Sequence, residues 1–165
     1  MRLLYFDIDG VILDYEERVK ARFLSGALEA ELRRAGFDKL VCVSGWSEIF
    51  QEPVLRIPVS QRGALLHKKI AAAFPDRDWF LRRLVLTTDT DNRCRDIDLA
   101  ADWYYMDDWA DEYFVNAHGR EAFELEKGRR VLLVDPYSDG SDVLEWLKTI
   151  PDPSARSRLE REGPS

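Results

Sequence analysis

The stretch Leu3-Leu4-Tyr5-Phe6-Asp7-Ile8-Asp9-Gly10-Val11 decides the fold of this chain. Its first four residues are an uninterrupted apolar run, which predicts a strand buried on both faces, as in a parallel sheet. Ligands of open α/β sheets bind beyond the carboxyl ends of the strands, so Asp7 and Asp9 are expected at a ligand-binding edge. Two carboxylates held this close need a cation or a shared proton to offset their charge. Gly10 allows a sharp turn without a side chain in the pocket, although an Asp-Gly turn can also form without any ligand.

Size and composition narrow the class of protein. The chain has 165 residues, 45% hydrophobic and 33% charged, which suits one soluble globular domain. No apolar stretch approaches the roughly 20 residues that a membrane helix needs, and no signal peptide is expected at the N-terminus. The two cysteines, Cys42 and Cys94, make no disulfide framework, and Cys42 is expected to be a buried thiol. We therefore expect a cytoplasmic protein without a membrane partner.

The net charge of −7 argues against a broad surface for nucleic acid. It leaves room for a local basic pocket that holds one phosphate. Some of the acidic residues are candidates for a divalent-cation site, because such a site needs clustered carboxylates.

Further apolar runs alternate with helical patterns along the chain. Strands are expected at 40–43, 84–88, 103–106 and 130–134, and helices at 16–36, 47–50, 61–74, 109–127 (with a loop) and 142–150. Gly26 is a candidate break in the first helix. The pattern predicts an α/β three-layer sandwich with a central parallel sheet of about five strands, formed by residues 1–150. Residues 151–165 are expected to be a mobile tail without a packed role.

Polar residues follow four of the five predicted strands, and these strand ends should meet at one edge of the sheet. They are Asp7 and Asp9, Ser44, Asp107 and Asp108, and Asp135. Asp7 is a candidate nucleophile, since carboxylates form aspartyl-phosphates in some enzymes. Asp9 is a candidate general acid and base. Asp107 and Asp108 are candidates to complete an all-oxygen Mg²⁺ site.

The neighbouring residues are candidates for binding a phosphate group. Ser44 and the backbone N–H groups near Gly45 can hold phosphate oxygens. A protein cation is also needed, because one Mg²⁺ does not offset all the charge that a phosphate brings.

These motifs resemble those of the haloacid dehalogenase-like superfamily of phosphohydrolases. Its first motif corresponds to Asp7-Ile8-Asp9-Gly10-Val11, its second to Val41-Cys42-Val43-Ser44-Gly45-Trp46, and its fourth to Tyr104-Tyr105-Met106-Asp107-Asp108. The resemblance covers residues 1 to about 150. It implies a Rossmann-like catalytic domain, a phosphoaspartyl intermediate on Asp7 and acid–base work by Asp9. It also implies Mg²⁺ held by Asp7, the Asp9 carbonyl and the acidic pair.

The third motif of that superfamily is a Lys or Arg, and this chain offers several. Asn92-Arg93-Cys94-Arg95-Asp96-Ile97 resembles the pattern of small members without a cap, which favours Arg93. Arg95 is a further candidate and, with Gly10, Ser44 and Gly45, a candidate substrate contact. Lys68 and Lys69 on the preceding helix are alternatives, and a solvated surface charge remains the alternative for each of these cations.

A rival placement of the fourth motif puts it at Asp135 and Asp139. We favour Asp107 and Asp108, because that choice leaves one strand between the second and fourth motifs and one strand after them. This arrangement matches the five-strand core of the superfamily.

The expected function is a Mg²⁺-dependent phosphatase. Neither gap between the motifs has room for a large cap, so the site should be open to a phosphorylated small molecule or the end of a macromolecule, with residues 48–60 as a candidate lid. Trp46, Trp109 and Tyr137 are candidates to line its mouth, while His67 and His118 are expected at the surface. The alternatives are a phosphotransferase or dehalogenase of the same superfamily, or a non-catalytic module that binds a phosphorylated partner.

Overall fold

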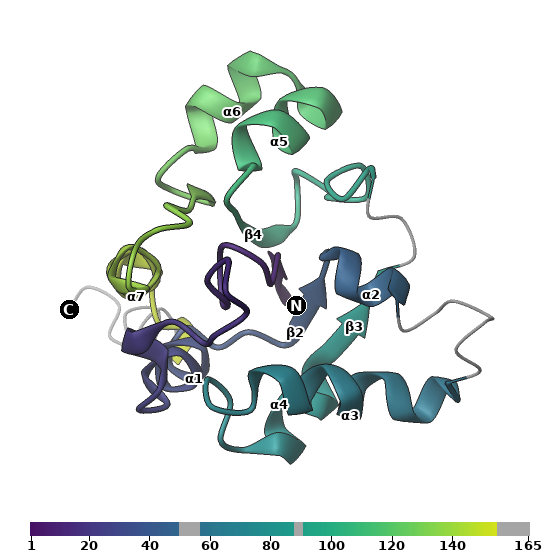
Figure 1. The fold of residues 1–165 in the computed structure, drawn as a ribbon. Coiled ribbons are helices and arrows are strands. Elements are labelled where there is room, and N and C mark those ends of the chain that lie inside the picture. Colours follow the sequence, from purple (N-terminus) through teal and green to yellow (C-terminus); the bar gives the residue numbers. More distant parts are fainter. Residues whose placement is uncertain (50–56, 88–90, 155–165) are drawn as a thin grey trace.

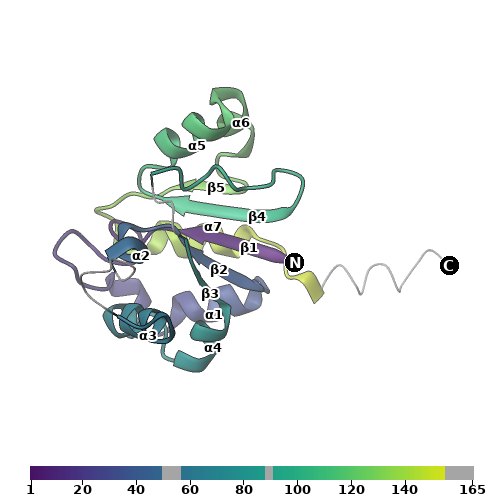
Figure 2. The ribbon, with the colours of Figure 1, turned by 90° about the vertical axis from the view of Figure 1, so that its right-hand side faces the viewer.

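A five-stranded parallel sheet forms the centre of the protein. The computed structural model describes residues 1–49, 57–87 and 91–154. The strands are β1 (Arg2–Phe6), β2 (Lys39–Cys42), β3 (Leu84–Leu86), β4 (Asp102–Asp107) and β5 (Val131–Leu133). Their order in the sheet is β3-β2-β1-β4-β5, and every neighbouring pair is parallel. The motif-bearing first strand is therefore central, between β2 and β4 (Figure 2).

Helices cover both faces of this sheet. They are α1 (Ala27–Arg34), α2 (Gly45–Ile49), α3 (Val59–Ile70), α4 (Arg77–Arg83), α5 (Ala110–His118), α6 (Arg120–Glu126) and α7 (Ser141–Thr149). Leu4 and Phe6 of β1 belong to a core shared with α1, α3, α4 and α7. Tyr5 points to the opposite face, since side chains alternate along a strand, and it belongs to a second core with Phe114 of α5 and Phe123 of α6. Figure 1 shows these two groups of helices on opposite sides of the strands, which confirms the predicted three-layer Rossmann-like α/β fold.

The helix expected over 16–36 is wrong in its first half. Only a short 3₁₀ turn, Ala21–Phe23, and α1 are helical there. Gly26 has a φ of 75° and precedes α1, so it is the break that the sequence indicated. The chain before it folds back tightly on the end of β1, because Ile12 and Leu13 both donate backbone N–H groups to the Ile8 carbonyl.

Helix α4 is missing from the sequence-based prediction. The residues around Pro75 were expected only to end the preceding helix, but Asp76 begins a new one. Its side chain accepts a hydrogen bond from the Trp79 N–H at 3.0 Å, as N-cap residues do. The apolar side chains of Trp79 and Phe80 are buried and hold α4 against the sheet.

Two other expectations are corrected. The tail was expected to make no packed contacts from residue 151 onward, but the Pro151 carbonyl accepts a hydrogen bond from Arg2 Nη1 at 2.8 Å. The ring of Pro153 also lies against Gly36, so tightly that a Cβ there would meet it. His67 is buried rather than on the surface, with its Nε2 2.8 Å from the Phe74 carbonyl. Residues 155–165, and residues 50–56 of the candidate lid, lie outside the described part of the chain.

Among the described residues, no helix has both the length and the apolar character that crossing a membrane requires.

Candidate active site

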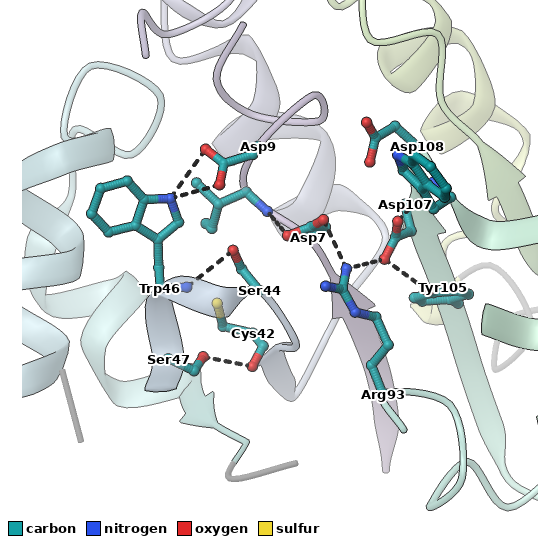
Figure 3. A network of polar contacts seen from close by, with 12 residues as sticks. Asp7, Asp9, Cys42, Ser44, Trp46, Ser47, Arg93, Tyr105, Asp107 and Asp108 are labelled. Carbon is teal, nitrogen blue, oxygen red and sulfur yellow. Dashed lines mark hydrogen bonds and ion pairs between the residues drawn. The ribbon is translucent and has the colours of Figure 1, made fainter. Parts of the chain in front are cut away.

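The carboxyl ends of the three central strands place the predicted motifs side by side. Asp7 follows β1, and its N–H donates to the Met106 carbonyl of β4 at 3.1 Å. On the other side, the Val43 N–H after β2 donates to the Phe6 carbonyl at 2.9 Å. These contacts bring Asp7 between Ser44 and Asp107 at one edge of the sheet, as expected (Figure 3).

Three carboxylates form a compact cluster at this edge. Asp7, Asp107 and Asp108 each offer an oxygen, and these oxygens lie within 4.8 Å of one another. Asp107 is fully buried and Asp7 is 6% exposed. Burial raises the pKa of Asp107 to about 6, and the negative charge of Asp7 adds to this effect. A set of hard oxygen donors at this separation fits a divalent cation such as Mg²⁺.

Gly10 leaves the space that Asp108 occupies. Its φ is 74°, which favours glycine, and a Cβ at this position would overlap the Asp108 carboxylate. The Asp108 carboxylate also accepts a hydrogen bond from the Tyr15 hydroxyl at 2.9 Å. Gly10 thus leaves room for an acidic residue of the cluster, and its predicted contact with a substrate stays a prediction.

Arg93 is the cation that reaches the cluster. Its Nη1 donates to Asp7 Oδ2 at 2.8 Å and to Asp107 Oδ2 at 2.7 Å, and its side chain is 10% exposed. The guanidinium lies over the Tyr113 ring, 4.1 Å from its centroid. Burial lowers the pKa of Arg93, but the carboxylates of Asp7 and Asp107 outweigh burial and raise it, so the side chain stays charged.

The alternative cations are seen in other contacts. Lys69 pairs with Glu17 at 2.6 Å and stacks over the Trp46 ring. Lys68 is exposed on α3. Arg95 lines a neighbouring cavity with Asn116 and is not among the residues that line the cavity of Asp7.

Asp9 lies beside the cluster and contacts Trp46. The indole Nε1–H donates to both carboxylate oxygens of Asp9, at 3.1 and 3.0 Å. Figure 3 shows the Asp9 side chain turned toward Trp46 and away from Asp107. Partial burial raises the pKa of Asp9, the hydrogen bond from Trp46 lowers it, and the charge of Asp7 raises it, with a net rise. The carboxylate of Asp9 therefore lies outside the three-carboxylate cluster, which suits the acid–base role predicted for this side chain and leaves the prediction for the Asp9 carbonyl untested.

Ser44 and Gly45 begin the turn after β2. Ser44 is fully buried, and its Oγ accepts a long hydrogen bond of 3.4 Å from the Trp46 N–H. Gly45 is exposed and is the first residue of α2. Ser44 lies on the side of Asp7 opposite to Arg93, where the sequence predicted a contact with phosphate oxygens (Figure 3).

The rival acidic pair does not join the cluster. Asp135 accepts a hydrogen bond from the Tyr137 N–H, within its own turn. Asp139 accepts one from Arg22 Nε at 2.9 Å, in a separate cavity that Tyr15 and Lys20 also line. Among the described residues, the geometry supports Asp107 and Asp108 as the fourth-motif acids.

Sequence reasoning missed the tyrosines that position the acidic residues. The Tyr105 hydroxyl donates to Asp107 Oδ2 at 2.7 Å, and Tyr15 holds Asp108. Tyr105 has a detectable signal, because residues two apart in a strand point to the same face and it stands two before Asp107. No sequence pattern links Tyr15 to Asp108, since 93 residues separate them.

The cluster opens into a cavity of about 290 Å³. Its polar lining consists of Asp7, Asp9, Arg93, Asp108 and Glu112, and its aromatic lining of Tyr15, Trp109 and Tyr113. The candidate nucleophile Asp7, the buried cation Arg93 and part of the candidate cation site thus face one water-accessible space.

Comparison of the chain with protein-family models, with curated proteins and with solved structures finds no match. The interpretation of the site therefore depends on its own residues and geometry.

Proposed function

We propose that this protein is a Mg²⁺-dependent phosphatase that works through a phosphoaspartyl intermediate on Asp7. The observation that carries the proposal is the position of Arg93, which bridges Asp7 and Asp107 within a cluster of three carboxylates. Its motifs resemble those of the haloacid dehalogenase-like phosphohydrolases, in which a nucleophilic aspartate, a cation and an acidic pair share one site. The agreement between this resemblance and the geometry supports the proposal.

Each residue has a defined part in the proposed reaction. A carboxylate oxygen of Asp7 bonds to the phosphorus of a phosphate monoester as the bond from phosphorus to the leaving oxygen breaks. Protonated Asp9 gives its proton to that oxygen. Asp9 then takes a proton from water, and the water oxygen bonds to phosphorus as the bond to Asp7 breaks. Phosphate leaves, and both aspartates return to their starting forms.

The raised pKa of Asp9 supports its role, because a general acid must hold its proton at the working pH. Trp46 contacts both Asp9 oxygens and so fixes the direction of this carboxylate. Arg93 offsets the negative charge that builds up on the phosphate oxygens, and Ser44 is the candidate donor on the opposite side.

Asp7, Asp107 and Asp108 would hold the Mg²⁺ ion. When bound, the ion supplies positive charge that screens Asp7 from the anionic substrate and stabilises the transition state. Tyr105 and Tyr15 keep two of these carboxylates in place.

The test is phosphate release from phenyl phosphate, with Mg²⁺ and with a chelator, for the wild type and Asp7→Asn. The matched control is Asp78→Asn, the same change on exposed helix α4, away from the cluster. We expect metal-dependent release by the wild type and the control, and a loss of at least about a thousandfold for Asp7→Asn, in the range of a removed nucleophile.

The outcomes separate the alternatives. Equal turnover by Asp7→Asn and the wild type would refute the nucleophile. Transfer to an added alcohol in preference to water would favour a phosphotransferase. Tight binding of phosphorylated ligands without turnover would favour the non-catalytic binding module, and halide release from a haloacid without Mg²⁺ would favour a dehalogenase.

A further inference from the structure

Exposed aromatic side chains gather at the mouth of the candidate site. In the ranges that the structure describes, three aromatic residues are largely exposed: Tyr15 at 54%, Trp109 at 55% and Tyr137 at 84%. The other described aromatic side chains are buried or half-buried. Exposing large rings to water is unfavourable, and a group of them beside a cavity is typical of a surface that binds something apolar.

Tyr15 and Trp109 are both tied to the carboxylates, Tyr15 by its side chain and Trp109 by its backbone. Tyr15 and Trp109 both line the cavity that contains Asp7. The Tyr15 side chain is held through its hydroxyl to Asp108, and the backbone of Trp109 is held by its N–H, which donates to Asp107 Oδ1 at 2.8 Å. Tyr137 supports Tyr15 from the outside, with the two rings edge-on at 5.5 Å between centroids. A phosphate ester at Asp7 would therefore carry its leaving group past the Tyr15 ring, which is held in place, and past Trp109, whose backbone is anchored to Asp107.

The negative charges around the cavity disfavour a substrate that carries another anionic group besides its phosphate. Asp9, Asp108 and Glu112 face the same space. Arg93 is the cation among the described residues of the lining, and it is already paired with two carboxylates. A leaving group with a carboxylate or another phosphate would meet repulsion, whereas an uncharged group would not.

We propose that the substrate is a phosphate monoester whose leaving group carries a flat, uncharged aromatic ring that stacks on Trp109 and Tyr15. This inference names the substrate class of the phosphatase proposed above and rests on that function. Aromatic rings gain more from contact with other rings than from apolar burial alone. Two sources share this chemistry: simple aryl and arylmethyl phosphates, and nucleoside monophosphates with their neutral bases.

The decisive comparison uses benzyl phosphate and cyclohexylmethyl phosphate. Both leave as primary alkoxides of similar size, so they differ mainly in the flatness and π-system of the ring. We expect kcat/KM to favour the benzyl ester by about 2- to 12-fold in the wild type, the factor that ring–ring contacts are worth. Trp109→Leu should reduce this preference toward one, and Trp109→Phe should retain most of it. Leu125→Ala, at another exposed apolar residue on α6, is the control that should retain the full preference.

Inert ligands test the ring preference without turnover. Benzylphosphonate and cyclohexylmethylphosphonate are titrated by calorimetry into the wild type and Trp109→Leu, with Mg²⁺ present. A ring preference lost in Trp109→Leu supports the inference, even if no ester is hydrolysed and the phosphatase proposal falls. Equal binding of the two phosphonates, or a preference that Trp109→Leu leaves unchanged, overturns it.

Two further experiments distinguish a nucleotide from an aryl ester as the substrate, and a substrate-binding surface from a protein interface. A higher kcat/KM for adenosine 5′-monophosphate than for phenyl phosphate supports a nucleotide, and the reverse order supports an aryl ester. A change of oligomeric state in Trp109→Leu, measured by light scattering, together with an unchanged ring preference, would assign the aromatic residues to a protein interface and refute the inference.

Discussion

Replacing Arg93 with methionine should destabilise the protein strongly, and more so at high pH. The guanidinium lies between Asp7 and Asp107, and the side chains of all three residues are at most 10% exposed. Removing one partner of a buried ion pair costs about 3 to 5 kcal/mol, because the remaining charge stays buried without compensation. We expect the lower end, about 3 kcal/mol, since the adjoining cavity admits water to this site. For a chain of this size that corresponds to a fall in Tm of about 6 to 12 °C.

The pH dependence follows from Asp107. In the wild type its pKa is raised to about 6 by burial and the charge of Asp7, with Arg93 acting in the opposite direction. When folding raises the pKa of a carboxyl group, the protein loses stability as the pH rises from the unfolded-state pKa to the folded-state pKa. Without Arg93 the folded pKa rises further, so the loss continues above pH 6 in the variant only. The difference between variant and wild type should therefore grow from pH 6 to pH 8, by at most about 1.4 kcal/mol per pH unit.

Urea unfolding followed by circular dichroism, in a chelator at pH 6 and pH 8, measures this difference. The control is Arg120→Met, since Arg120 is 64% exposed and makes a 3.7 Å surface pair with Glu124 that should contribute little. Adding Mg²⁺ should recover part of the loss in Arg93→Met, because a cation would again offset the carboxylates. A loss below about 1 kcal/mol, or one that is equal at both pH values, would refute the account of Arg93 as a buried counter-charge.

Two other predictions concern the turn and the periphery. Gly10→Ala should lower the free energy of unfolding by more than the roughly 1 to 2 kcal/mol that a left-handed backbone costs a residue with a Cβ. It should also weaken Mg²⁺ binding, because the new Cβ would displace Asp108. Gly128→Ala has a similar φ of 77° with open space around it and should show only the backbone cost, so equal stability and Mg²⁺ titrations for the two variants would contradict the steric argument. Hydrogen bonds, chiefly from Ser141 and then from Arg22, lower the pKa of Asp139 to about 2. Asp139 should therefore stabilise the folded protein above pH 3.8, and this stabilisation should be lost as the pH falls from 3.8 to about 2. Acid unfolding should show Asp139→Asn less stable than the wild type at pH 5 and equally stable at pH 2, and a gap that persists at pH 2 would exclude this linkage.

The strands, and the edge of the sheet at which their polar residues meet, could be predicted from the sequence because the signal of each strand is local. Each predicted strand is a continuous apolar run, which is typical of a strand buried on both faces of a parallel sheet. The polar residues that follow β1, β2 and β4 then had to share an edge. Asp7, Ser44 and Asp107 were therefore expected at one edge of the sheet, where the structure has them (Figure 3).

Helix boundaries near glycine and proline were less predictable. The apolar spacing over 16–36 fits one helix, but Gly26 adopts a left-handed backbone and the chain before it folds against β1 instead. At Pro75, the sequence was interpreted as an end, although Asp76 caps the start of α4 with its side chain. Tertiary contacts override the local helix propensity at both places, and such contacts cannot be predicted from local sequence alone.

The contacts within the site needed the structure. Arg93, Arg95 and Lys69 are alike as charges in the sequence; the resemblance of residues 92–97 favoured Arg93, and the fold shows that Arg93 contacts Asp7. The same is true of Tyr15, which contacts Asp108 across the chain. The residue types in the sequence indicated the kind of site. Which residues of one type contact the carboxylates depends on where the loops place them at the edge of the sheet.

The most direct test of the central claim is whether phosphorus from the substrate becomes covalently attached to Asp7. Radiolabelled phosphate ester is mixed with the wild type and with Asp7→Asn in Mg²⁺, the reactions are quenched in acid, and the labelled peptides are mapped. The account predicts an acid-stable, base-labile label on the peptide that contains Asp7, and no label in the variant. Label on another residue, or undiminished turnover by Asp7→Asn, would contradict it.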